Sequence, residues 1–296
     1  MLIMPHARPY LLIFIACLYS FFSVCSYASN FVETNASILY DDNLGRAEQD
    51  ADIRGDSALQ LSVSAGKVFH PSVGNSLVLK TNLQTTQWFD VTDLSQFSLG
   101  IMGQFTHKFG LGALTPRVSA SLSIDYADFR SDIRDSWIYR AETRLDKRLD
   151  EYWELHGGIA YKISRAREEG SSARPPFDVF DQQRFSVFMG GDYALTEDVL
   201  LSATYRYHNG DIDSTATAPN ARFLNASTAR AIDDAFGNDK VVYKLDSNTQ
   251  DVTLEANWIL TDNTALTMGY EYLLTTATDE IEYKSNLLRL SIFVSF

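Results

Sequence analysis

Apolar and polar residues alternate one by one along many separate stretches of this chain. Because successive side chains of a β-strand point to opposite faces, a period of two predicts a strand with one apolar and one polar face. The clearest stretch carries Val118, Ala120, Leu122, Ile124 and Tyr126 on one face and Arg117, Ser119, Ser121, Ser123 and Asp125 on the other.

Twelve such stretches are centred near residues 35, 64, 81, 102, 122, 141, 158, 189, 204, 255, 270 and 290. Most have the roughly 9–11 residues that a tilted strand needs to cross a bilayer. Their polar faces are rich in Ser, Thr, Gly, Asn and Gln, as in a hydrated barrel interior, whereas a soluble sandwich turns its polar faces outward. The pattern predicts an all-β fold, a transmembrane antiparallel up-and-down β-barrel of about 12 strands. Weaker alternation at 30–40 and 141–149 leaves a ten-stranded barrel open.

The predicted connections alternate in length. Those after even-numbered strands are short, at 71–75, 110–115, 150–152, 196–198 and 261–263, whereas those at 41–56, 165–183 and 210–248 are long and polar. Short turns at one rim and long loops at the other are typical of outer-membrane barrels. Three short turns share one template, in which three polar residues follow Leu149, Leu195 or Leu260. Aromatic residues at strand ends, Tyr283 among them, are predicted to lie at the membrane interfaces.

The amino terminus has the features of a secretory signal peptide for export by the Sec route. Arg8 precedes an apolar run, and Ser26-Tyr27-Ala28 is a small-x-small cleavage site. The predicted division is a signal peptide at 1–28 and an outer-membrane β-barrel at 29–296. An uncleaved membrane anchor and a lipoprotein signal ending at Cys25 are the alternatives. After residue 28, no window holds eighteen consecutive apolar residues.

Composition argues against several classes of function. Both cysteines, Cys17 and Cys25, lie in the predicted signal, so the exported chain offers no disulfide, zinc–thiolate cluster or thiol nucleophile. A net charge of -13 without a basic stripe argues against a nucleic-acid partner. No Gly-x-Ser-x-Gly elbow, His-Glu-x-x-His, phosphate-binding loop or dinucleotide fingerprint occurs. We therefore expect no cofactor, no metal and no nucleic acid.

The signal peptide, the strand and turn pattern and the last strand together resemble those of Gram-negative outer-membrane β-barrel proteins. That last strand alternates Leu288, Leu290, Ile292, Val294 and Phe296. A terminal Phe in this position resembles the signal that the barrel-assembly machinery reads, although Val294 stands where an aromatic residue is common. The resemblance implies an outer-membrane location with periplasmic termini and contact with outer-membrane lipids and lipopolysaccharide. It points to a porin-like or uncharacterised subfamily and implies no particular activity.

Charged residues of both signs fall on the polar faces of the predicted strands. The set is Lys80, Lys108, Arg117, Arg140, Glu142, Arg144, Lys162, Arg184, Asp192, Arg206, Glu255, Glu271 and Arg289. These residues are predicted to line the lumen of a narrow passive channel for small solutes or ions. The alternative is a filled interior in which the charges pair with one another. A second class of function is a non-enzymatic surface-interaction or structural barrel that acts through its long outer loops.

The long loops carry the remaining candidates. Residues 221–236 could form one helical turn capped by Ser227 or Thr228, leading to Asp233 and Asp234 as carboxylates at a constriction, or could belong to a mobile surface loop. The Asp-rich stretch at 41–56 lacks the spacing of a calcium loop, so a solvated face is the preferred interpretation.

The one arrangement that could support catalysis pairs Ser186 with His208. If Leu195 lies opposite Val199, the two side chains lie across from each other on the inner face near the outer rim. Serine and histidine near the outer rim would suit a lipid-directed hydrolase, the third class of function. Strands rich in serine bring such pairs together by chance, so the preferred interpretation is that the chain is not an enzyme.

Overall fold

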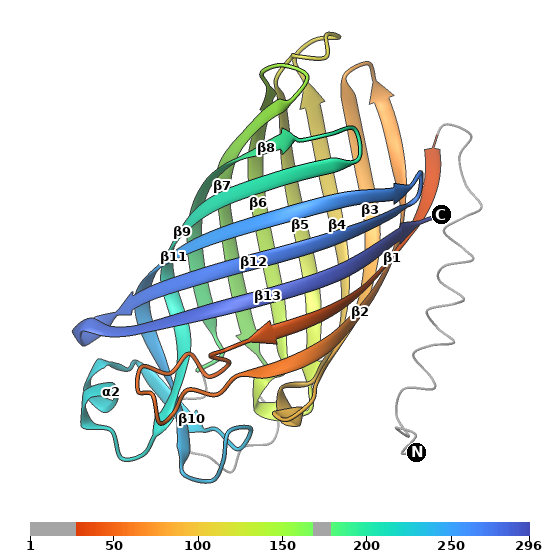
Figure 1. Cartoon of the computed structure of the whole chain (residues 1–296). Helices are drawn as coiled ribbons and strands as arrows, with labels where there is room; N and C mark the ends of the chain where they lie inside the picture. The colour runs from red at the N-terminus through yellow and green to blue at the C-terminus, as the bar shows by residue number, and fades with distance from the viewer. Residues whose placement is uncertain (1–27, 168–178) are drawn as a thin grey trace, which may run out of the picture.

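The computed structural model describes residues 28–167 and 179–296. The predicted signal peptide lies outside these residues apart from Ala28, the first residue of the first strand. Twelve strands form the barrel (Figure 1). Their bounds are β1 Ala28–Asp41, β2 Asp56–Ser72, β3 Asn75–Trp88, β4 Gln96–Lys108, β5 Arg117–Phe129, β6 Ser136–Arg148, β7 Trp153–Ala166, β8 Gln182–Ala194, β9 Val199–Thr217, β11 Lys240–Thr261, β12 Thr264–Ala277 and β13 Ile281–Ser295.

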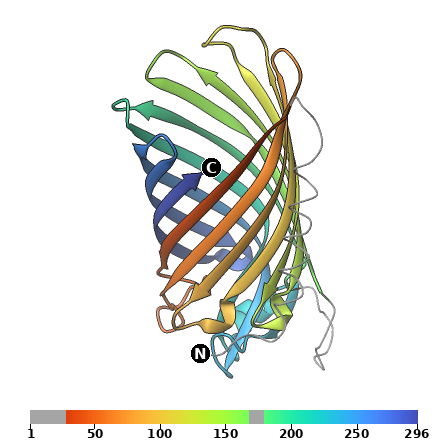
Figure 2. The ribbon, with the colours of Figure 1, turned by 90° about the vertical axis from the view of Figure 1, so that its right-hand side faces the viewer.

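Every strand of the ring pairs antiparallel with its neighbours in the chain. Strand β9 continues to β11, and the ring closes where β13 pairs with β1. The short strand β10 (Ala229–Ile232) adds to the mouth end of β11. The chain is therefore a closed twelve-stranded up-and-down barrel, as the alternation predicts, and the ten-stranded alternative is wrong. Figure 2 shows the strands inclined around the barrel wall.

The apolar residues of the alternating stretches point out of the barrel. Leu122 is 68% exposed, Met268 64% and Ile101 59%, although a soluble protein would bury such side chains. Their polar neighbours point inward, which is the arrangement of a barrel surrounded by lipid. No helix among the described residues is long and apolar enough to cross a membrane.

The short turns fix the register of the wall. The Leu149 amide donates to the Trp153 carbonyl (2.8 Å) and the Leu195 amide to the Val199 carbonyl (2.9 Å), so two uses of the turn template are confirmed. The third is wrong, because Leu260 bulges out and Thr261 pairs with Thr264. Both chain ends of the barrel lie at this short-turn end, where the Ser295 amide donates to the carbonyl of Asn263 (2.9 Å) in the β11–β12 turn.

The predicted long loop at 210–248 is mostly strand. The β9–β11 hairpin continues in register from Gly210 opposite Ser247 to Thr217 opposite Lys240. In the sequence, the many polar residues of this segment obscure the apolar positions such as Ile212 and Leu245. In the structure, these two residues pack in one apolar cluster. Gly210 has a φ of +137°, and a Cβ there would lie 2.3 Å from the Gln183 carbonyl oxygen, so only glycine permits the hairpin to continue past β8.

A short helix connects this hairpin to β10. Helix α2 (Ala221–Ala226) begins after Asn220, whose side chain accepts a hydrogen bond from the Phe223 amide (3.2 Å). Ser227 is the C-cap of this helix, where its amide donates to the Phe223 carbonyl (2.9 Å), and Thr228 precedes β10. The helical turn therefore comes before these residues and does not lead from them to Asp233.

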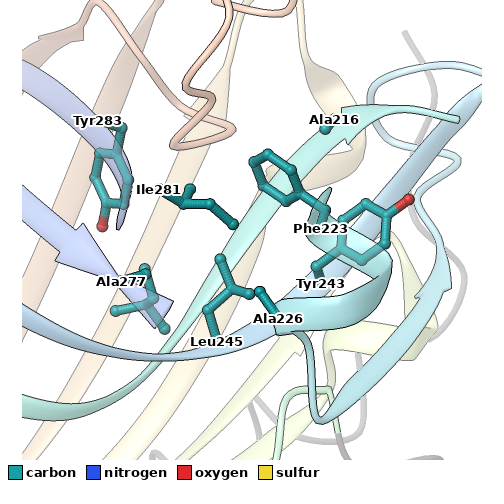
Figure 3. Packing of buried hydrophobic residues seen from close by; sticks show 9 residues of the cluster. Ala216, Phe223, Ala226, Tyr243, Leu245, Ala277, Ile281 and Tyr283 are labelled. Carbon is teal, nitrogen blue, oxygen red and sulfur yellow. The ribbon is translucent and has the colours of Figure 1, made fainter. Parts of the chain in front are cut away.

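The apolar core lies at the long-loop end of the barrel rather than at its middle. Phe223 of α2 packs in one cluster with Tyr243 and Leu245 of β11 and with Ile281 and Tyr283 of β13 (Figure 3). Tyr283 is only 4% exposed, so its predicted place in the aromatic girdle is wrong. It lies opposite Thr275 on the inner face of the wall. By contrast, Trp137 and Trp153 are each 46% exposed at the strand ends.

Candidate functional site

A folded segment lies across the long-loop end of the barrel. We call residues 211–246 the lid; it comprises the ends of β9 and β11 with α2 and β10 between them. It contacts the connections β1–β2, β3–β4, β5–β6, β7–β8 and β12–β13 through the apolar clusters and polar contacts described here. The lid is therefore held from all sides of the mouth.

Apolar contacts join the lid to the opposite side of the barrel. Phe236 of the lid packs with Val91 and Leu94 of the β3–β4 connection. In a ring of twelve strands, the β3–β4 hairpin lies six strands away from the β9–β11 hairpin, on the opposite side. On another side, Val179 of the β7–β8 connection packs with Ala229 and Val242. The lid therefore spans the mouth.

A buried chain of charges joins the lid to two other connections. Asp233 is completely buried and accepts hydrogen bonds from Arg134 (2.7 Å) and the Thr215 hydroxyl (2.6 Å). Arg134 also lies 3.6 Å from Asp213, which pairs with Arg46 at 3.1 Å. The proximity of Asp213 raises the pKa of the Arg46 guanidinium further above its ordinary value. Because Asp233 is enclosed by these partners, its carboxylate does not meet a passing ion.

A second ion pair fastens the stem of the lid. Asp52 of the β1–β2 connection accepts from the Lys240 ammonium (2.6 Å), the Thr217 amide (2.9 Å) and the Thr217 hydroxyl. Burial opposes ionisation of Asp52, but the hydrogen bonds from Lys240 and Thr217 outweigh it and hold the pKa of this carboxyl below its usual range. We call the Asp52–Lys240 pair the latch.

Asp56 and Asp42 of the predicted Asp-rich stretch are also used internally. Asp56 accepts from the Asp90 and Val91 amides (2.9 Å each), and Asp42 accepts from the Asn286 amide (2.7 Å). These carboxylates tie the β1–β2 connection to its neighbours instead of facing solvent. Among the described residues no group of histidine, cysteine or acidic side chains could hold a metal ion.

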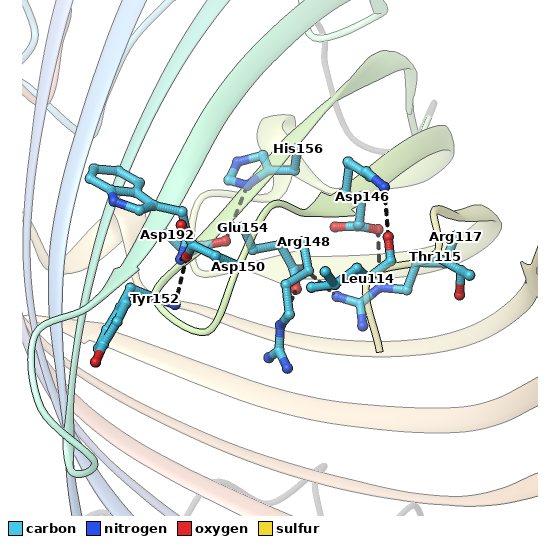
Figure 4. A network of polar contacts seen from close by, with 12 residues as sticks. Leu114, Thr115, Arg117, Asp146, Arg148, Asp150, Tyr152, Glu154, His156 and Asp192 are labelled. Atoms are coloured by element: carbon cyan, nitrogen blue, oxygen red, sulfur yellow. Dashed lines mark hydrogen bonds and ion pairs between the residues drawn. The ribbon is translucent and has the colours of Figure 1, made fainter. Parts of the chain in front are cut away.

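Ion pairs line the wall at the short-turn end (Figure 4). Arg117 lies 2.5 Å from Glu154 and 3.4 Å from Asp146, which also pairs with Arg144 at 2.6 Å. The predicted register of Arg148 opposite Glu154 is confirmed. These side chains border a cavity of about 300 Å³. They sit on the inner face of the wall.

Asp192 continues this network to the next strands. Its carboxylate accepts from the Ser202 hydroxyl (2.6 Å) and lies 3.3 Å from His156, whose other ring nitrogen lies 3.1 Å from Thr204. The cross-strand neighbours Asp146 and His156 occur in the register predicted from the turn.

The remaining charged candidates lie on several different strands of the wall. Arg140, Lys162 and Arg184 stand in one row on β6, β7 and β8. Glu255 and Glu271 lie on β11 and β12, which follow β9 around the ring. The others are Glu142 opposite Ala160, Lys80 opposite Met102, Lys108 opposite Arg117, Arg206 opposite Asp251 and over the Phe188 ring at 4.7 Å, and Arg289 opposite Gly269.

The structure brings Ser186 and His208 together. The Ser186 hydroxyl lies 2.6 Å from His208 Nδ1, and His208 Nε2 lies 3.7 Å from Asp251. All three side chains are buried on the inner face. An ester group of a surrounding lipid would have to enter the barrel wall to reach this serine, so the geometry favours a structural polar contact over a lipid-directed nucleophile.

Two predicted residues lie at the surface. Asp234 is exposed beside its buried neighbour Asp233. Phe296 is 75% exposed, and its amide donates to the Val32 carbonyl (2.8 Å) next to the line where the barrel closes.

Sequence reasoning missed the residues that hold the lid. Arg46, Arg134 and Asp213 look like ordinary loop charges, because their partners lie 79 to 167 positions away in the chain by residue number. One local signal exists: Ile212, Ala216, Tyr243 and Leu245 repeat an apolar pattern inside a stretch predicted to be loop. That pattern identifies a packed element.

No family model matches the chain, and no curated protein matches it. Several solved structures are similar to it. The COG4313 outer membrane channel from Pseudomonas putida F1 aligns with a TM-score of 0.59 at 12% identity, over 93% of this chain and 99% of that chain. The KdgM porin in complex with disordered oligogalacturonate has a TM-score of 0.47 at 10% identity, over 90% and 99%. The transport unit of the autotransporter AIDA-I from Escherichia coli has 0.47 at 9% identity, over 100% of both. The similarity to the Pseudomonas channel concerns the fold, that of an outer-membrane β-barrel.

Proposed function

We propose that this protein is a narrow passive channel for small solutes or ions in the outer membrane of a Gram-negative bacterium. The observation that carries the proposal is the closed ring of twelve strands with apolar side chains outside and polar ones inside. A ring of this size is wider than the filled eight-stranded barrels and narrower than sixteen-stranded porins. Its interior therefore suits small hydrated solutes.

The same proposal covers the export of the chain and its orientation in the outer membrane. Residues 1–28 direct the chain through the Sec route and are removed, and the barrel-assembly machinery inserts 29–296 with Phe296 as part of its signal. The termini and short turns then face the periplasm, and the lid faces outward, where lipopolysaccharide surrounds the barrel. Long loops outside and short turns inside are the usual arrangement of such barrels.

The charged candidates set the preference of the pore in this proposal. Arg117 and Arg144 pair with close carboxylates at the short-turn rim, and Asp192 accepts a hydrogen bond from the Ser202 hydroxyl. The cationic row on β6 to β8 and the acidic residues on β11 and β12 lie on different sides of the lumen. A solute passing between them experiences a field across the pore.

A second function is favoured by the lid. Its apolar contacts span the mouth from β9–β11 to the β3–β4 connection. A barrel with a closed mouth would act through its outer surface, as a structural or interaction barrel, without passing solutes.

Conductance separates these two functions. We would refold 29–296, confirm folding by heat-modifiable migration in electrophoresis, and record single-channel currents in planar bilayers. The matched variant is Arg134→Met, which removes the buried partner of Asp233 in the lid. Steady current steps from the native barrel support the channel, and steps from the variant alone support a channel closed by its lid. Folded barrels that are silent in both forms would overturn the channel proposal and leave the surface function.

A further inference from the structure

We propose that Arg140, Lys162 and Arg184 form a binding site for a small solute that carries two or more carboxylate or phosphate groups. This inference deepens the proposed function by naming the class of solute, and it rests on that function. The site occupies the inner face of β6, β7 and β8, on the side of the barrel opposite β1 and β13.

The register sets the geometry of the site. Arg140 lies directly opposite Lys162, and Lys162 lies directly opposite Arg184. Neighbouring strands are about 4.8 Å apart, so three cationic side chains emerge from one row across about 10 Å of wall. Long side chains from such a row can converge on one solute molecule.

Arg140, Lys162 and Arg184 have fewer carboxylate partners than they have cationic groups. Arg140 pairs with Asp125 at 2.5 Å. Across residues 28–167 and 179–296, neither Lys162 nor Arg184 has a carboxylate within ion-pair distance. Arg140 is therefore the one member of the row that has a carboxylate partner among the described residues.

Neighbouring groups do not supply the missing charge. The charged groups that act most strongly on Lys162 are Arg184, Arg140 and Arg46, and the carboxylate among its main neighbours is Asp213. Asp213 already pairs with Arg46 and faces Arg134, which holds Asp233. Those two arginines and two aspartates neutralise one another.

Other cations of the inner wall contrast with this row. Arg117 and Arg144 have carboxylates within 3.4 Å or less, so their charge is satisfied within the wall. Lys80 lies alone on β3, between Gly66 and Met102. The row on β6 to β8 combines adjacent cations with a lack of partners, and mutual repulsion in a confined lumen favours a bound anion.

The arginine and lysine side chains contact such an anion in different ways. The guanidinium groups of Arg140 and Arg184 present flat donor pairs that match the two oxygens of a carboxylate or phosphate. Lys162 between them supplies a point charge with three donors. A solute with two or three anionic groups contacts the whole row, whereas a single carboxylate contacts one member.

The test measures binding to the refolded barrel directly. Calorimetry in detergent would compare citrate, pyrophosphate and acetate at equal ionic strength, and planar bilayers would record block of the current by the same anions. The test variant is Lys162→Gln and the matched control is Lys80→Gln, which removes the same charge from another wall. Arg184→Gln is the second test variant. Removing one of three adjacent cations relieves repulsion, so these variants fold.

We expect citrate or pyrophosphate to bind the native barrel more tightly than acetate, and the preferred anion distinguishes carboxylate from phosphate recognition. Lys162→Gln and Arg184→Gln each weaken binding roughly tenfold, the scale of one charged hydrogen bond. Lys80→Gln leaves binding within about twofold, because a lone cation contributes little in a screened lumen. Equal losses in Lys162→Gln and Lys80→Gln, or equal binding of citrate and acetate, would overturn the site.

The two proposals fail separately. Anion binding with the expected variant pattern in a barrel that carries no current keeps the site and removes the channel. Current without selective anion binding keeps the channel and removes the site.

Discussion

The two ends of the barrel differ in how their connections are used. At the long-loop end, Phe236 and Asp233 are buried in a lid that reaches the opposite wall. At the short-turn end, Val73 and Leu111 are each 82% exposed at the tips of their turns. Ion pairs at that end lie along the wall beside a cavity of about 300 Å³.

In the proposed channel, this difference assigns control of access to the lid end. Charges at the short-turn end pair with neighbours on adjacent strands, so they stiffen the rim without crossing the opening. Charges at the other end pair between connections far apart in the ring, so they hold one element over the opening. Variants at the lid should change access, and variants at the rim should change local stability.

The largest effect is expected from Arg134→Met. The variant leaves Asp233 as a buried charge without its partner, which costs about 3–5 kcal/mol of local stability. The lid should detach while the barrel stays folded. Limited trypsin digestion should cleave at Arg222 or Arg230 faster than in the native protein. Arg130→Met, an exposed arginine of the same connection, is the control and should match the native rate. Equal protection in both variants would show that the charge chain does not hold the lid.

A smaller effect is expected from Asp52→Asn. The amide cannot pair with Lys240 as a carboxylate does, and charged hydrogen bonds contribute about 1.5–3 kcal/mol. The lid should loosen at its stem, and the open fraction of single-channel records should rise. Asp50→Asn removes the same charge from an exposed position in the same connection. If Asp50→Asn raises the open fraction as much as Asp52→Asn, surface charge is the cause and the latch is not.

The latch also predicts how the lid responds to pH. The pKa of Asp52 is lowered in the folded protein. Its contribution is therefore complete above its ordinary pKa and is lost only as the pH falls through the lowered value. Protease protection of the lid should stay constant from pH 8 to about pH 5 and decline below about pH 4. A decline between pH 7 and pH 5 would contradict control by this carboxylate.

The smallest effect is expected from Glu154→Gln at the short-turn rim. Arg117 is half-exposed, and exposed ion pairs contribute below about 1 kcal/mol. Thermal unfolding followed by circular dichroism should shift slightly, and lid proteolysis should be unchanged. Glu151→Gln in the neighbouring turn is the control. A change in lid protection for Glu154→Gln would break the proposed separation between the two ends.

Much of the wall could be predicted from sequence because its rules are local. Alternation fixes which face each residue occupies, and the turns at Leu149 and Leu195 set the register, down to Ser186 opposite His208. The bulge at Leu260 escaped prediction because a leucine followed by three polar residues matches the template of the other two turns.

The lid could not be predicted because its contacts are distant in the chain. Polar residues such as Asp211 and Asp213 hide the continuing strand, and Asp233 gains a partner only when Arg134 reaches it from another hairpin. The sequence pattern places Tyr283 in the membrane-interface girdle, but the residue belongs to a buried cluster. Aromatic residues are common at strand ends in both settings. The sequence pattern alone does not separate these settings.

The pairing of β1 with β13 has a consequence for the order of assembly. Asn35 lies opposite Phe293 and Asp41 opposite Leu287, so this junction joins segments at the two extremes of the barrel sequence. The other eleven junctions of the ring can form between neighbours in the chain, whereas this one waits for the final strand. Until it forms, the sheet has two free edges with unpaired backbone groups that lipid cannot satisfy. Pairing of β1 with β13 therefore removes both free edges at once and is the last step of strand pairing in the barrel.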